Sequence, residues 1–302
     1  MKFTGVLNLK KKAGPTSHDV VASVRQLVPK KTKVGHAGTL DPMAEGVLPV
    51  CVGAATKIFP YLLDCQKTYR ATMIFGRVTD TQDTTGETLS EEAPGEISLV
   101  EAQRLLDTFR GEGIQVPPMY SALKVGGTRL HELARAGKEV EREGRAITVF
   151  DIRALELVGS SLTFDVTCSR GTYIRSICHD VGALQGSGGC MDALTRTQLG
   201  PFRIEEGIFL EEAEALADEG HLQESLITLS DALTHLPAIT LRPGKEDRFR
   251  NGVQLENRYF EAAEPLQGDS KVRVLGNNGD LVAVGIILPG GERIRADRVF
   301  SR

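Results

Sequence analysis

The chain has 302 residues, 41% of them hydrophobic and 25% charged, proportions that exclude extended disorder and fibrous repeats. No apolar run approaches the roughly 20 residues that cross a bilayer, and the N-terminus lacks the apolar segment of a signal peptide, so we expect a cytoplasmic protein that does not bind membranes. The net charge of −4 argues against a nucleic-acid partner, yet residues 1–80 contain twelve Lys or Arg against five Asp or Glu. The N-terminal quarter is therefore basic, as a phosphate-binding surface requires.

Two short lysine clusters supply much of this charge, at residues 10–12 and at residues 30, 31 and 33. Such clusters suit phosphate groups, but they are equally typical of solvated surface. The sequence leaves both interpretations open.

Cysteine and histidine spacing gives no sign of a metal site. The five cysteines are scattered without a CxxC pair, and the six histidines show no HxxxH or HxH spacing. The nucleotide and nucleophile motifs GxxxxGK, GxGxxG and GxSxG are also missing from the sequence. We therefore expect reduced, mostly buried thiols, no metal and no cofactor.

The first predicted helix begins at Thr16 or Ser17, because Asp19 completes a Thr-x-x-Asp capping pattern ahead of an apolar stripe. Residues 68–75 have the pattern of a strand. Ser98 opens a second helix that reaches Phe109.

Residues 35–42, Gly-His-Ala-Gly-Thr-Leu-Asp-Pro, form the most unusual segment of the chain. Asp41 before Pro42 is typical of a helix N-cap followed by proline at the first helical position. A carboxylate on a loop bounded by glycines, beside His36, also suits presentation to a substrate. The two roles are compatible. Residues 80–86 lack the acidic spacing of a calcium loop, and we expect a surface turn there.

Residues 117–145 are rich in charge and contain Gly126-Gly127, which favours an excursion from the core, a flap. Beyond it, residues 161–169 alternate as a strand with one buried face, and an apolar stripe from Ile174 to Leu184 predicts a helix. Strands and helices intermingle without a repeating strand–helix unit. We therefore expect an α+β fold with a mixed, largely antiparallel sheet flanked by helices.

The pattern of predicted elements changes in the last part of the chain. An acidic helical stretch at residues 210–225 is followed by a Pro and Gly boundary at residues 237–244, after which short strands alternate with Gly-containing turns. These patterns divide the chain into a larger domain, 1–236, and a small β-rich domain, 237–302.

Five separated segments together resemble one family, the bacterial tRNA pseudouridine synthases of the TruB type. They include the GHAGTLDP and GTYIR motifs and span residues 35–57, 67–87, 115–137, 168–180 and 194–202. The C-terminal β-rich domain is similar, more loosely, to the PUA-type RNA-binding module of that family. One departure is the family's Lys-Pro-x-Gly, which stands here as Lys11-Lys12-Ala13-Gly14.

The resemblance implies the pseudouridine synthase fold and isomerisation of the uridine at position 55 in the T loop of tRNA. Base flipping, cleavage of the glycosidic bond, rotation of the base and rejoining through carbon 5 need no cofactor. Asp41 is the implied essential carboxylate, in keeping with carboxylate chemistry at glycosidic carbons. The implied partner is the T arm of tRNA alone, without guide RNA or protein subunit, and we expect a monomer.

The same resemblance implies substrate-binding roles for Arg175, which would pair with Asp41, for Tyr69, which would stack on the base, and for His36 and Tyr173. Without the resemblance, we would interpret Arg175 as a residue on the surface of a helix and Tyr69 as a core residue. His36 would be a loop residue whose hydrogen bonds are made within the protein. The implied RNA-contacting residues of the flap are Lys124, Arg129, Arg135 and Lys138, which otherwise read as a solvated charged face.

Two other classes of protein stay open on the sequence. One is a non-catalytic protein that binds or folds tRNA with an idle site. The other is a hydrolase acting on nucleosides or glycosides through the same aspartate. Neither explains why the Asp41, Tyr69 and Arg175 segments occur together, so we rank the synthase first.

Overall fold

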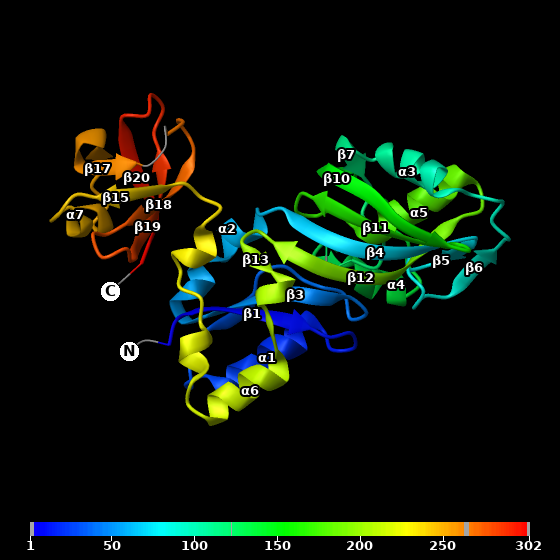
Figure 1. Cartoon of the computed structure of the whole chain (residues 1–302), viewed down its shortest axis with the longest axis horizontal. Coiled ribbons are helices and arrows are strands. Elements are labelled where there is room, and N and C mark those ends of the chain that lie inside the picture. The colour runs from blue at the N-terminus through cyan, green and yellow to red at the C-terminus, as the bar shows by residue number, and fades with distance from the viewer. Residues whose placement is uncertain (1–2, 122, 263–265, 301–302) are drawn as a thin grey trace.

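The computed structural model describes residues 3–121, 123–262 and 266–300. Within them, the chain forms a large body built on one long sheet and a smaller C-terminal body built on a second sheet (Figure 1). None of the helices in these residues is both long and apolar enough to span a membrane.

The long sheet has ten strands within the described residues, and eight of them follow the order β14-β1-β3-β12-β4-β11-β10-β7. All neighbours on this path are antiparallel except β14 with β1 and β3 with β12, so the predicted mixed, largely antiparallel sheet is confirmed. The strands of this sheet are β1 (Gly5–Lys11), β2 (Val34–His36), β3 (Glu45–Val52), β4 (Lys67–Phe75), β7 (Gly111–Gln115), β10 (Arg145–Val158), β11 (Ser161–Cys168), β12 (Gly189–Leu199), β13 (Phe202–Arg203) and β14 (Ile208–Phe209).

Helices flank the sheet, as predicted, and two small hairpins extend from it. Near β1 lie α1 and α6, while α5 packs on β12 and β4 and α3 packs on β10 (Figure 1). The helices of this body are α1 (Ser17–Leu27), α2 (Phe59–Leu63), α3 (Leu99–Asp107), α4 (Leu130–Arg135), α5 (Ile174–Gln185) and α6 (Leu210–Asp218). The hairpins pair β5 (Arg77–Thr79) with β6 (Thr88–Glu91) and β8 (Lys124–Val125) with β9 (Thr128–Arg129).

Local sequence signals account for several of these elements. Thr16 and Asp19 form the predicted capping box of α1, in which Thr16 Oγ1 accepts from Asp19 N at 3.1 Å and Asp19 Oδ2 accepts from Thr16 N at 2.9 Å. Ser98 and Glu101 do the same for α3. The alternation in β11 also holds, because Leu162, Phe164, Val166 and Cys168 are all buried in the main core.

The C-terminal body is a six-stranded sheet in the described residues, and the predicted β-rich region is confirmed. Its elements are β15 (Ala238–Leu241), α7 (Glu246–Arg250), β16 (Leu255–Glu256), β17 (Phe260–Ala262), β18 (Lys271–Leu275), β19 (Leu281–Ile287) and β20 (Arg293–Val299). Buried residues of this region, Leu281, Val284 and Phe300, share one apolar cluster with Leu62 and Leu233 of the large body. At the same junction the Tyr61 hydroxyl donates to Asp297 at 2.5 Å.

Candidate active site

A cavity of about 660 Å³ opens on the long sheet, where the loop before β3 faces β4 and the start of α5. The loop contributes residues 38–41, and the segment 170–175 lines the opposite side. Because residues from distant parts of the chain converge here, the cavity is the natural place for a substrate.

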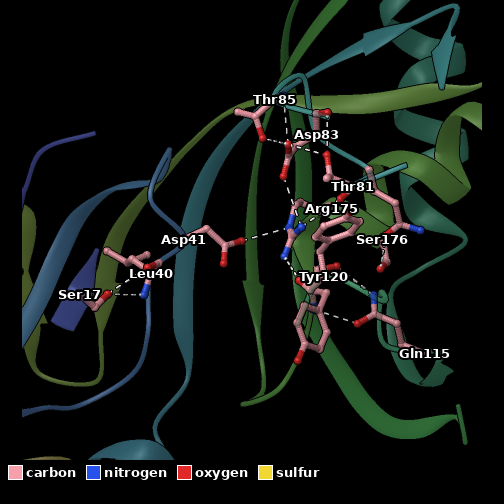
Figure 2. Close-up of polar contacts among 12 residues, drawn as sticks. Ser17, Leu40, Asp41, Thr81, Asp83, Thr85, Gln115, Tyr120, Arg175 and Ser176 are labelled. Carbon is pink, nitrogen blue, oxygen red and sulfur yellow. Dashed lines mark hydrogen bonds and ion pairs between the residues drawn. The ribbon is translucent and has the colours of Figure 1, made fainter. Parts of the chain in front are cut away.

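Asp41 lies on this loop, with its side chain 40% exposed and directed into the cavity (Figure 2). Its carboxylate Oδ2 lies 3.0 Å from Arg175 Nε. The N-cap interpretation is wrong, because a turn closed by Ala44 N donating to Asp41 O leads directly into β3, not into a helix. Asp41 is therefore not a helix N-cap, and it lines the cavity.

Side-chain donors from remote parts of the chain hold the backbone around Asp41. The Ser17 hydroxyl donates to Leu40 O at 3.0 Å and accepts from Leu40 N at 2.8 Å. Lys11 Nζ donates to Pro42 O at 3.0 Å and to Ala44 O at 2.7 Å. Lys11 is only 2% exposed, so neither the phosphate-binding nor the solvated interpretation of the first lysine cluster applies to it.

Arg175 is buried at the start of α5, and its reading as a surface helix residue is wrong. Besides Asp41, its guanidinium contacts a second carboxylate, with Nη1 at 3.3 Å from Asp83 Oδ2. It also donates to Thr81 O at 3.0 Å and to Tyr120 O at 2.9 Å. Five hydrogen-bond donors in a fixed plane suit this set of acceptors, which fixes the orientation of the side chain.

Asp83 is the functional candidate that the sequence missed. Its side chain is only 6% exposed, whereas residues 80–86 were expected to form a surface turn. Oδ1 accepts from the Thr81 hydroxyl at 2.8 Å, from Thr85 N at 3.0 Å and from the Thr85 hydroxyl at 2.5 Å (Figure 2). Thr81 and Thr85, two of the three threonines in Asp-Thr-Gln-Asp-Thr-Thr-Gly, were the available signal, since a buried carboxylate needs such donors.

Tyr69 and Tyr173 both line the cavity. Tyr69 is almost wholly buried in β4 and belongs to the main core, so its interpretation as a core residue is confirmed, while its contact with a base stays a prediction. Burial raises the pKa of the Tyr69 hydroxyl, against the lowering effect of the Arg196 charge. Tyr173, just before α5, is held through its backbone by Gln115, which accepts from Tyr173 N at 2.8 Å and donates to Tyr173 O at 3.0 Å.

The remaining sequence candidates are His36 and the four residues of the flap. His36 ends β2 and is half-buried, and burial together with the Arg196 charge lowers the pKa of its imidazole. The described residues that line the cavity do not include it. Lys124 and Lys138 are exposed on the flap, and the side chains of Arg129 and Arg135 lie outside the described part of the structure.

Two buried cations near the cavity were also missed, Lys67 and Arg196. Lys67 Nζ donates to Leu63 O and Cys65 O at 2.9 and 2.8 Å, and burial followed by the Arg196 charge lowers its pKa to about 8. Both residues stand between polar neighbours in the sequence, Gln66 and Thr68 for Lys67 and Thr195 and Thr197 for Arg196, so nothing local signals their burial.

The chemistry that this arrangement supports is carboxylate chemistry on a bound nucleoside. An oriented carboxylate can act as a nucleophile or base, and the contact with Arg175 orients that of Asp41. Tyr69 presents an aromatic ring at the same cavity. The described residues hold no group of three His, Cys, Asp or Glu side chains that could bind a metal, and the expectation that the enzyme needs none stays a prediction.

Comparison with known proteins places this geometry in a family. Residues 25–174 match the family model for the N-terminal domain of TruB family pseudouridylate synthases, and residues 175–236 match that for the C-terminal domain of tRNA pseudouridylate synthase B. The chain is 44% identical over 285 residues to tRNA pseudouridine synthase B of Clostridium perfringens, covering 94% of this chain and 95% of the relative. It is 42% identical over 307 residues to that of Geobacter sulfurreducens, covering 98% and 99%.

Among solved structures, the chain resembles a protein chain in an H/ACA ribonucleoprotein bound to a substrate RNA containing 2′-deoxyuridine. The TM-score is 0.78 at 26% identity, over 99% of this chain and 86% of that chain. This similarity extends over both sheets and agrees with the predicted pseudouridine synthase fold. The chain belongs to the TruB family of pseudouridylate synthases.

Proposed function

We propose that this chain converts the uridine at position 55 in the T loop of tRNA to pseudouridine, with Asp41 as its essential carboxylate. Membership in the TruB family supports the reaction class, isomerisation of uridine to pseudouridine in tRNA. The choice of uridine and the role of each side chain are part of the proposal. So is action on tRNA by a monomer, without a guide RNA, a second protein or a cofactor.

The observation that carries the proposal is the setting of Asp41. Its carboxylate is oriented by Arg175 at 3.0 Å, and it faces a cavity that Tyr69 also lines. During the reaction the bond from C1′ to N1 breaks and a bond from C1′ to C5 forms, while C5 loses a proton and N1 gains one. Atoms and electrons balance, so a carboxylate and a site that retains the detached base are sufficient.

The cavity requires that the uridine leave its stack in the RNA. A nucleotide in a loop is cheaper to extrude than one in a duplex, where unstacking costs a few kcal/mol. Tyr69 and Tyr173 would replace part of the lost stacking within the cavity. The exposed Lys124 and Lys138 on the flap would meet phosphates of the T arm.

The test incubates an unmodified tRNA transcript with wild-type protein or Asp41→Asn, without added metal or nucleotide, and maps pseudouridine chemically. We expect conversion of the single uridine at position 55 by the wild type and none by the variant. A transcript with cytidine at position 55 controls for the choice of target. If the wild type binds the transcript and converts no uridine, the protein binds or folds tRNA without catalysis, and release of free uracil would identify a hydrolase instead.

A further inference from the structure

We infer that Arg196 is a positioning residue for the reaction, which holds the Asp41 loop and Tyr69 at a fixed separation. The inference deepens the proposed function and rests on it. Arg196 lies in β12, its side chain is among the largest that are fully buried, and it is only 1% exposed.

The contacts of Arg196 bracket the catalytic loop. Nη2 donates to Gly38 O at 2.9 Å and Nη1 to Thr39 O at 3.4 Å, both on the N-terminal side of Asp41. Nε donates to Val47 O at 2.7 Å, on its C-terminal side. One guanidinium therefore binds the backbone before and after Asp41 and connects both segments to β12.

The strand register places the same residue next to the stacking tyrosine. In β12, Arg196 pairs with Gly46 of β3 on one side and with Tyr69 of β4 on the other. The charge of Arg196 also acts on the Tyr69 hydroxyl, because it opposes the rise in the pKa of that hydroxyl that burial causes. Gly46 has φ of +100°, and a Cβ there would lie 2.2 Å from Arg196 O, so only glycine permits this approach.

Packing alone does not explain why the buried side chain at position 196 is charged. Among the described residues, no carboxylate forms an ion pair with it, and the acceptors of its hydrogen bonds are the backbone carbonyls described above. Burial of an unpaired cation is unfavourable, and an apolar side chain of similar volume would fill the space more stably. Three carbonyls aimed at one rigid, planar group do account for it, because that geometry fixes the loop.

A small displacement of this loop has a large effect on the reaction. Misplacement of a reacting group by about 1 Å slows a reaction by about 100-fold. Arg196→Met keeps the buried volume and removes all three donors, so we expect the single-turnover rate to fall by about 100-fold while affinity for the RNA stays within about twofold, since phosphate contacts dominate affinity.

The experiment measures release of tritium from a tRNA transcript carrying 5-tritiated uridine, because rejoining through C5 displaces that hydrogen. Single-turnover rates are taken with enzyme in excess, and binding is measured separately on the same transcript. Arg273→Met is the matched control. Arg273 is only partly buried, but like Arg196 it is held by backbone carbonyls, Leu236 O and Ser230 O, both at 3.0 Å, and it lies in β18 of the C-terminal body.

We expect Arg196→Met alone to lose the single-turnover rate, at a temperature where all variants are folded by circular dichroism. Equal loss in Arg273→Met, or a wild-type rate in Arg196→Met, would overturn the inference. Arg196→Lys keeps the charge but offers one nitrogen, and it should react about tenfold slower, with unchanged affinity; a wild-type rate here also overturns it. Absence of tritium release by the wild type would overturn the proposed function and the inference with it.

Discussion

Asp41 and Asp83 contact the same guanidinium, that of Arg175, from surroundings that differ in almost every respect (Figure 2). The side chain of Asp41 is 40% exposed and, within the described residues, forms an ion pair with Arg175. That of Asp83 is 6% exposed and receives hydrogen bonds from Thr81 and Thr85 in addition. One carboxylate is accessible to a substrate, and the other is fully occupied.

Because their surroundings differ, the carboxylates of Asp41 and Asp83 have different tasks. Asp83 and its threonines stabilise the buried charge of Arg175 and fix the direction of its guanidinium. Arg175 in turn orients Asp41, which lines the cavity. Under the proposed function, the reactive carboxylate is therefore oriented by a structural one through a shared cation, and the two should respond differently to substitution.

Removal of the shared cation should have the largest combined effect. In Arg175→Met, Asp83 stays buried without its charged partner, which we expect to lower the free energy of unfolding by about 4 kcal/mol. The rate should fall about 1,000-fold, because Asp41 loses its orientation. Urea unfolding and single-turnover assays measure the two losses. A stable variant with a low rate alone would contradict the assigned structural role of Asp83.

Asp83→Asn should weaken the fold more than the chemistry. The amide places a donor towards Arg175 Nη1, so we expect a loss of about 3 kcal/mol in unfolding free energy. The rate at saturating enzyme should fall only about tenfold, through the looser Arg175. A wild-type stability with a rate as low as that of Asp41→Asn would show that the two aspartates have been assigned the wrong way round.

The pH dependence of stability tests whether Lys67, which lines the same cavity as Asp41, is a buried cation. Burial first, and the Arg196 charge second, lower its pKa to about 8 in the folded protein, against an ordinary 10.5. Between these pH values the unfolded chain holds a proton that the folded chain has released, so the free energy of unfolding rises with pH. Relative to Lys67→Met, the wild type should gain up to about 3 kcal/mol from pH 8 to 10.5. A flat difference would contradict the burial of the ammonium group.

Thr85→Val tests the smallest contribution, a hydroxyl that donates to Asp83 at 2.5 Å. Valine has the same shape and leaves the Thr85 N–H contact in place. We expect a loss of about 1.5 kcal/mol in unfolding free energy, the usual value for a hydrogen bond to a charged group, and a rate within twofold of the wild type. Thr84→Val, whose hydroxyl contacts the more exposed Asp192, is the matched control. Equal losses in both variants would count against a special role for the Asp83 cluster.

Local patterns in the sequence predicted the local parts of the fold. The capping boxes at Thr16 and Ser98 and the alternation of residues 161–168 depend on neighbours within a few positions, and the structure confirms them. Asp41 was a candidate from its loop and family motif, but its N-cap reading failed. The Glu45–Val52 segment pairs with β1 and β2, and this tertiary pairing overrides the helical preference of Asp-Pro.

The parts of the site that could not be predicted depend on pairings far along the chain. The local sequence around Asp83 predicts only a turn. Its partner Arg175 lies 92 positions away in the sequence and is brought to it by α5. Arg196 contacts carbonyls that carry no sequence signal. The burial of Lys11 could have been predicted from the sequence. Lys11 follows the buried Leu7 and Leu9 at intervals of two residues in β1, so the three side chains lie on the same face of the strand.

The most direct test of the central claim compares Asp41→Asn with the wild type in unfolding free energy, in affinity for the unmodified transcript and in pseudouridine formed at position 55. The exposed, singly partnered carboxylate predicts unchanged folding, within about 0.5 kcal/mol, and unchanged affinity. It also predicts no detectable product after many wild-type turnover times. Product at a rate within tenfold of the wild type would contradict the assignment of Asp41 as the essential group.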